Sequence, residues 1–219
     1  MTIFGSAVAP PADTESAAWI ASLLGDFGTV GGLVPDGFEQ YLLVRHKRIQ
    51  NRHGNDVGLI STIASLAERH TTTPDRIWFA IWEGYGWAGG RTGYPVSGGG
   101  LSARLVRVWL RHRTRLVDLR RARRIHHGLA NVPLFDLPNR RCYLVCGPLH
   151  AAPRIVEPGG SGLQLPDLWW PGDRQWFVAT DTDLEWTYLG GSHAFIADVT
   201  AALPDLSEPV QRNHRNVSF

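Results

Sequence analysis

The chain has 219 residues, of which 43% are apolar and 10% aromatic, so it can bury a sizeable core and is not a disordered polar chain. Its formal net charge is only +2, which does not by itself predict a polyanionic partner. It contains no apolar run of about 18 residues and no basic leader followed by an apolar segment, so we expect a soluble, cytoplasmic protein.

The first part of the chain alternates helix and strand signals. Residues 1–12 are rich in proline and alanine and are expected to be loosely ordered. Asp13 is a plausible cap for a short helix, and Tyr41–Val44 reads as a strand. Apolar residues recur at helical spacing from Val57 toward His70. In Arg76–Glu83 both alternating faces are apolar, which predicts a central strand covered on both sides.

Residues 84–140 are the most biased part of the sequence and a candidate insertion. A glycine-rich loop precedes a basic amphipathic helix expected over residues 101–129, and residues 104–124 hold nine arginines against a single acid. Only one of the 22 basic residues of the chain, Lys47, is a lysine, so the abundance of arginine also reflects a general bias. The basic-patch candidates are Arg107, Arg111, Arg115, Arg120, Arg121, Arg123 and Arg124.

This helix has two interpretations. It could bind the phosphates of a nucleic acid, an anionic membrane or an acidic partner. Alternatively, its basic face is solvated and pairs with the acidic remainder of the same chain.

After this helix the sequence predicts further strands and one more helix. Arg141–Val145 reads as a strand. The only two cysteines, Cys142 and Cys146, lie on either side of Tyr143–Val145, too far apart for a disulfide and too few for a zinc site. Trp176–Ala179 and Glu185–Leu189 read as a strand pair joined by a turn. Ser192 can cap the helix that follows.

These elements predict one α+β domain over residues 13–204. Its mixed or mostly antiparallel sheet should contain four to six strands with flanking helices and an Arg-rich helical insertion. Residues 205–219 are expected to form a polar tail.

Catalytic motifs are sparse. Asp181 and Asp183 form a DxD triplet that could hold a divalent metal, or could cap a turn through backbone amides. Glu83 could pair with this turn as acid and base if the strand ends were neighbours. No P-loop, GxSxG or HExxH motif occurs. We therefore assign no catalytic residue, no metal site and no cofactor.

Three sequence blocks resemble an uncharacterised family of bacterial hypothetical proteins of about this size. They are Val34–Tyr41, Trp78–Gly86, and Trp169–Asp183 together with Thr187–Ser192. The resemblance implies no activity and transfers no catalytic residue. In element order alone the chain is also similar to the SMI1/KNR4-type immunity proteins, which end in a hairpin, a capped helix and an acidic surface. The Arg-rich helix departs from both patterns.

The favoured hypothesis is a non-enzymatic protein-binding module, toxin-neutralising or regulatory, with an aromatic surface as its contact. Its alternatives are nucleic-acid binding through the helix at 101–129 and a metal-dependent enzyme using the Asp181–Asp183 turn. The tryptophans of the surface could equally belong to the core, and the sequence predicts no oligomeric state. The binding-surface candidates are Trp169, Trp170, Asp181, Asp183, Trp186 and Tyr188.

Overall fold

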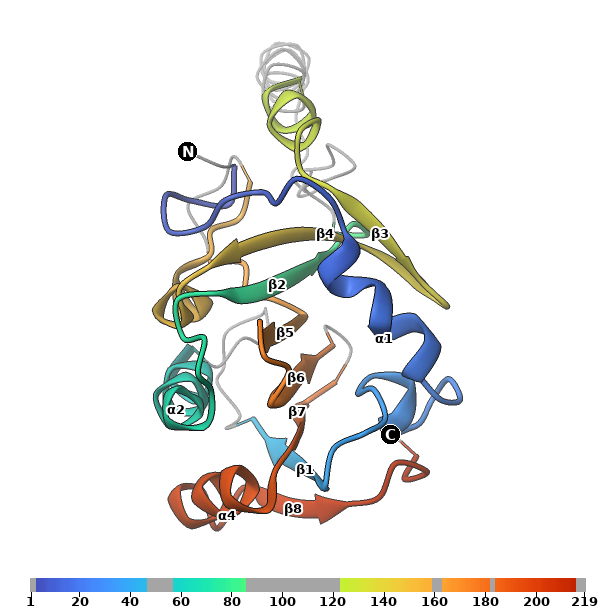
Figure 1. Cartoon of the computed structure of the whole chain (residues 1–219), viewed down its shortest axis with the longest axis vertical. Helices are drawn as coiled ribbons and strands as arrows, with labels where there is room; N and C mark the ends of the chain where they lie inside the picture. Colours follow the sequence, from blue (N-terminus) through green and yellow to red (C-terminus); the bar gives the residue numbers. More distant parts are fainter. Residues whose placement is uncertain (1–2, 47–56, 86–122, 159–162, 182–183, 216–219) are drawn as a thin grey trace, which may run out of the picture.

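The described part of the chain folds around one eight-stranded sheet in which every neighbouring pair of strands is antiparallel. The computed structural model describes residues 3–46, 57–85, 123–158, 163–181 and 184–215. The strand order is β3-β4-β2-β5-β6-β7-β1-β8 (Figure 1). The strands are β1 (Gln40–Arg45), β2 (Ile77–Trp82), β3 (Leu134–Leu137), β4 (Arg140–Gly147), β5 (Leu168–Pro171), β6 (Trp176–Thr180), β7 (Trp186–Gly191) and β8 (Ser207–Val210).

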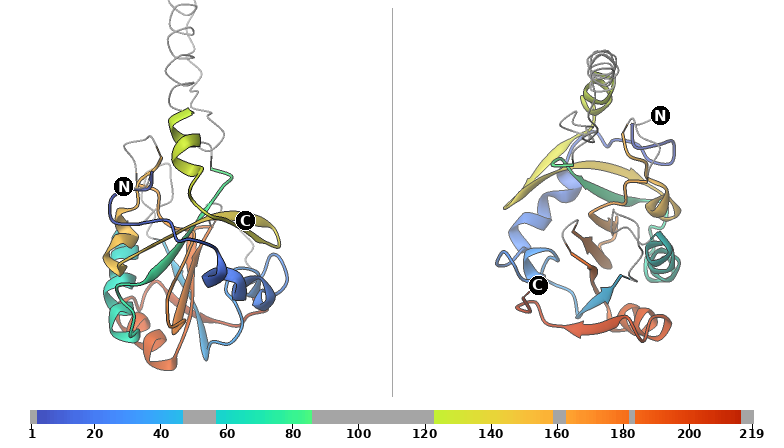
Figure 2. Two further views of the ribbon diagram at one scale, coloured as in Figure 1. Left: turned by 45° about the horizontal axis from the view of Figure 1, so that its top comes forward. Right: turned by 180° about the vertical axis from the view of Figure 1, so that it is seen from behind.

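Helices cover both faces of this sheet. The α-helices are α1 (Ala18–Leu23), α2 (Val57–Ala67) and α4 (His193–Ala202), and residues 123–129 are also helical. The 3-10 helices are η1 (Glu15–Ala17), η2 (Val30–Gly32), η3 (Glu68–His70) and η4 (Leu149–Arg154). Figures 1 and 2 show α2 and α4 on one side of the sheet and α1 on the other.

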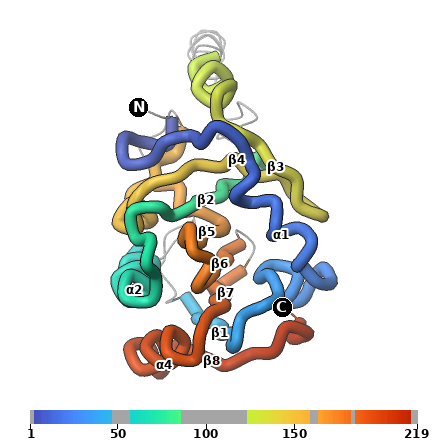
Figure 3. Tube along the Cα trace, viewed as in Figure 1, coloured from blue at the N-terminus to red at the C-terminus, as the bar shows by residue number. Residues whose placement is uncertain are grey.

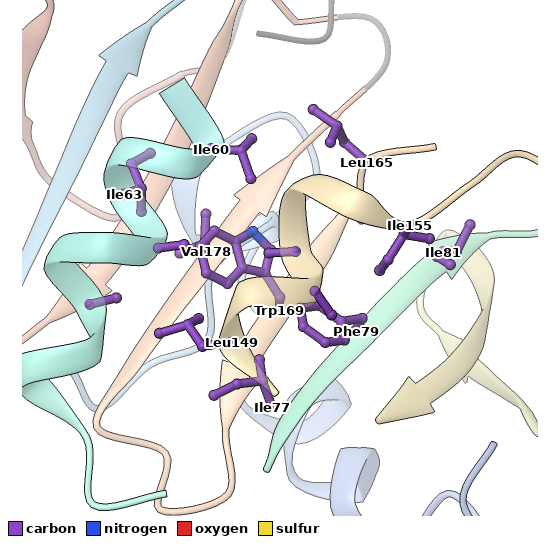
Figure 4. Packing of buried hydrophobic residues seen from close by; sticks show 14 of the residues in the cluster. Ile60, Ile63, Ile77, Phe79, Ile81, Leu149, Ile155, Leu165, Trp169 and Val178 are labelled. Carbon is purple, nitrogen blue, oxygen red and sulfur yellow. The ribbon is translucent and has the colours of Figure 1, made fainter. Parts of the chain in front are cut away.

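Two hydrophobic cores result, one on each face. The first packs α2, α4 and η4 against side chains such as Phe79, Trp169 and Val178, and Figure 4 shows Trp169 beside Ile60 in this core. The second core packs α1 and the segment after it against the opposite face of the sheet. Its strand residues include Trp170 and Phe177, which are adjacent in sequence to Trp169 and Val178 of the first core. Adjacent residues of one strand enter opposite cores because strand side chains alternate between faces. The apolar runs of the central strands are therefore long in sequence but divided in space.

The number of strands differs from the expected four to six. The described residues form eight, and the sequence pattern missed β3, β5 and β8. Each has only four residues, too few to show a period of two clearly. All four residues of β5 are buried, so this strand does not alternate in polarity at all. The α+β class and the helices flanking the sheet agree with the expectation.

The two ends of the described chain are packed onto the fold. Phe4 and Val8 are buried, and Ala9 forms a backbone bridge with Cys146, whereas the sequence predicted a loosely ordered lead-in. β8 lies within the expected polar tail and pairs with β1. Figure 3 traces the last described residues to a position beside the segment that follows α1, where the Val30 amide donates to the carbonyl of His214 at 2.9 Å.

In the described ranges, no helix has both the length and the apolar character needed to cross a membrane.

Candidate functional site

Most polar side chains of interest gather at one end of the sheet, which we call the loop-bearing end. Here β1, β2, β3 and β6 finish, and β4, β5, β7 and β8 begin. Loops at one end of a rigid sheet are a common location for functional residues.

The aromatic surface predicted from the sequence is not exposed in this fold. Trp169, Trp170 and Tyr188 are each 0% exposed, and Trp186 is only partly exposed. Trp169 faces one core and Trp170 the other, because the two are adjacent on β5. Their position in the core corrects their assignment as binding-surface residues.

The acidic candidates at this end form ion pairs. Asp181 Oδ2 lies 2.9 Å from Arg140 Nη2, and both side chains are largely buried. Glu83 Oε1 lies 2.7 Å from Arg141 Nη2. Asp183 lies outside the described residues. Among the residues that are described, no three His, Cys, Asp or Glu side chains come together as metal ligands. Asp181 therefore helps to join β6 to the β3–β4 hairpin.

The basic helix is described only at its end. Arg123 and Arg124 are exposed and helical, whereas Arg107, Arg111, Arg115, Arg120 and Arg121 lie outside the described residues. Binding of a nucleic acid by this helix stays a prediction.

A row of polar side chains crosses the sheet at the loop-bearing end, on the face of the α2 core. His46 Nε2 lies 2.9 Å from Thr187 Oγ1, which lies 2.9 Å from Thr180 Oγ1. The Thr180 amide donates to the carbonyl of Asp167, and the Tyr85 hydroxyl donates to Asp167 Oδ1 at 2.8 Å. We call these five residues the polar row. Sequence reasoning missed it because its members are scattered singly along the chain.

Asp167 is the most perturbed member of the polar row. Its carboxylate accepts a hydrogen bond from the amide of Trp82 at 2.8 Å, where the regular β2–β5 pairing has already ended at Ala80–Leu168. Burial raises the pKa of Asp167 to about 7, although the Trp82 and Tyr85 donors act to lower it. A carboxyl with this pKa can exchange its proton near neutral pH. The sequence offers one hint, the Pro166-Asp167 pair directly before an apolar strand.

The most exposed large apolar side chain of the described residues lies on the other face, in the loop after α1. Phe27 is 77% exposed, compared with 44% for Leu163 and 39% for Leu23. We call its neighbourhood the Phe27 surface, defined by Leu23, Asp26, Phe27, Asp36, Arg212 and Arg215. The sequence signal is a phenylalanine between glycines, Gly25-Asp26-Phe27-Gly28, outside any periodic apolar stripe.

The Phe27 loop is held by backbone hydrogen bonds. The amide of Gly25 donates to the carbonyl of Gly31 at 2.7 Å, and the amide of Gly31 donates to the carbonyl of Arg212 at 2.8 Å. Gly28 adopts a φ of +79°, which favours glycine. Arg212 Nη2 donates a hydrogen bond to the carbonyl of Leu23 at 2.8 Å. Arg212 Nη1 forms an ion pair with Asp36 Oδ2 at 3.2 Å. The exposed ring therefore stands on an anchored loop.

Two hollows adjoin this ring. One of about 730 Å³ is lined by the loop together with Arg212 and Arg215, and one of about 190 Å³ is lined by the loop together with Arg140, Asp181 and Leu184. Phe27 and Gly28 line both hollows, so Phe27 stands between them. This arrangement of an apolar ring, arginines and adjoining hollows suits the capture of another molecule.

Comparisons with known proteins give no match to a family model, to a curated protein or to a solved structure.

Proposed function

We propose that the chain is a protein-binding module that contacts its partner through the Phe27 surface. The observation that carries this proposal is the 77% exposure of Phe27 on a hydrogen-bonded loop. An exposed large apolar side chain interacts unfavourably with water, and a well-anchored one loses little conformational entropy on binding. Aromatic residues and arginine are the types most enriched where protein partners bind tightly. The Phe27 surface combines both.

A cytoplasmic location is part of the same proposal. Cys142 and Cys146 are both free thiols. Burial raises the pKa of each of them, which favours unreactive, reduced thiols. Reduced cysteines are typical of cytoplasmic proteins.

Site-specific photo-crosslinking in the producing cells tests the proposal. A photoreactive phenylalanine analogue, p-benzoylphenylalanine, replaces Phe27 in one version of the full chain. In the control it replaces Leu163, which is exposed but lies outside the Phe27 surface. We expect a discrete crosslinked protein at position 27 that is absent at position 163.

The crosslinked protein is then purified and its affinity for the chain measured by calorimetry. Phe27→Ala should weaken binding by about 30-fold or more, the effect of a central interface residue. Leu163→Ala should leave the affinity unchanged. The same crosslinked proteins at both positions, or equal affinities for both variants, would exclude the Phe27 surface as the binding site.

A further inference from the structure

The Phe27 surface offers both a protruding group and a place to receive one. Phe27 projects from its loop, and the hollow of about 730 Å³ opens directly beside it. Pockets of roughly 300–1,000 Å³ enclose ligands larger than a phenyl ring. A phenylalanine from another molecule would therefore fit in this hollow. In a twofold dimer the same patch acts on both copies, so each can supply the ring that the other receives.

The charged side chains of the Phe27 surface also suit contact with the same surface of a second copy. Asp26 and Arg215 both line the larger hollow, and neither forms an ion pair within the described part of the chain. Arg212 is already paired with Asp36. The two aspartates and two arginines of the Phe27 surface give it no net charge, which disfavours a polyanion as its binding partner. Across a twofold axis, Asp26 of one copy can face Arg215 of the other.

Pairing of edge strands between two copies is a less favourable route to self-association than contact through the Phe27 surface. The edge strands β3 and β8 have four residues each. Pro209 lies within β8 and has no amide proton to donate, which blunts this edge against strand addition. Self-association through the side chains of the Phe27 surface requires neither a long edge strand nor a free backbone amide.

We propose that the partner at the Phe27 surface is a second copy of this chain, in a twofold dimer where each Phe27 enters the larger hollow of the other copy. This inference rests on the proposed function, because it names the partner of the same surface. Asp26 of each copy lies opposite Arg215 of the other.

Sedimentation velocity on the full chain tests the dimer. From about 1 to about 100 µM, a range in which a modest interface saturates, the mass should rise from 24.2 kDa toward twice that value. Phe27→Asp should raise the dissociation constant by about 30-fold or more. Leu163→Asp is the matched control and should leave it unchanged. Both side chains are exposed, so thermal melting should show both variants folded.

A charge exchange tests the geometry of the dimer. Asp26→Arg alone and Arg215→Asp alone each place like charges opposite one another, and each should weaken the dimer by about 5-fold or more. The double variant restores opposite charges and should recover most of the affinity. Two single variants that weaken the dimer without recovery in the double variant would overturn the pairing of Asp26 with Arg215.

The failure of this inference differs from failure of the proposed function. A chain that remains at 24.2 kDa, or a dimer that Phe27→Asp leaves intact, overturns the second-copy assignment. If crosslinking at position 27 then identifies a different protein, the protein-binding function stands with another partner. If position 27 gives neither self-association nor a specific crosslink, both proposals fall.

Discussion

Asp167 and Asp173 lie on either side of the same short strand, β5, yet the fold shifts their pKa values in opposite directions. Asp173 sits in the turn toward β6 and is partly exposed. Its carboxylate accepts hydrogen bonds from the Thr71 hydroxyl at 2.9 Å, the Thr72 amide at 2.6 Å and the Thr72 hydroxyl at 2.8 Å. Burial acts to raise the pKa of Asp173, but these donors outweigh it, and the pKa falls below 3.8.

Asp167 differs in burial and in the number of its donors. It is 3% exposed and accepts hydrogen bonds from Trp82 and Tyr85. Loss of water outweighs these two bonds, so its pKa rises to about 7. A charged Asp173 thus fastens the turn at one end of the sheet, while the loop-bearing end contains an acid that can change its charge near neutral pH.

The largest effect is expected from removing the side chain that anchors β5 between the two aspartates. Trp169→Ala deletes a fully buried ring of the α2 core and should lower the free energy of unfolding by about 3–5 kcal/mol. Urea denaturation measures this loss. Leu163→Ala is the control and should change stability by less than about 0.5 kcal/mol because its side chain is exposed and lies outside the Phe27 surface. Equal losses in the two variants would contradict the burial of Trp169.

A smaller loss is expected at the turn. Asp173→Ala should cost about 2 kcal/mol near neutral pH because it leaves the Thr71 and Thr72 donors without their charged acceptor. The folded-state pKa of Asp173 is lowered, so its contribution is present above about pH 4 and is lost as the pH falls through the folded value. Urea denaturation across pH 2–7 should therefore show the two proteins converging in acid. A constant difference at every pH would contradict the ionic role of Asp173.

The effect of Asp167 on stability has the opposite dependence on pH. Its folded-state pKa of about 7 exceeds the ordinary 3.8, so the native state keeps a proton that the unfolded state releases. The wild-type free energy of unfolding should fall between about pH 4 and pH 7, by an amount on the order of 4 kcal/mol.

Asp167→Asn should remove this slope, because the amide does not titrate in this range. Asp173→Asn serves as the control and should retain the slope. Denaturation midpoints at pH 5 and pH 8 are sufficient for the test. An unchanged slope in the Asp167 variant would show that another group titrates there.

The sequence predicted the longer elements well because their patterns repeat enough to be recognised. The helix starting at Val57, the two-faced strand β2 and the Ser192 cap all appear, with Ser192 Oγ accepting a hydrogen bond from the Phe195 amide at 3.3 Å. β3 forms a short hairpin with β4 and was missed because four residues are too few to show a pattern. β5 and β8 were also missed because their partners β2 and β1 lie far along the chain. Local patterns do not contain that information.

The candidate sites were harder to predict. An apolar run such as Trp169-Trp170 shows that burial is favourable, but a surface patch and a strand buried on both faces have the same local composition. The polar row joins residues from five separate segments, from His46 to Thr187. The exposure of Phe27 depends on how residues 211–215 pack beside its loop, which only the fold determines.

The position of β1 in the sheet has a consequence for biosynthesis. Gln40 pairs with Gly191, and Tyr41 pairs on the other side with Val210. β1 therefore leaves the ribosome long before either neighbouring strand has been made, and such distant pairings form slowly because a large loop must close. Until then, the apolar residues Leu42, Leu43 and Val44 have no strand beside them. This interval is when the nascent chain would be most prone to aggregate and most dependent on chaperones.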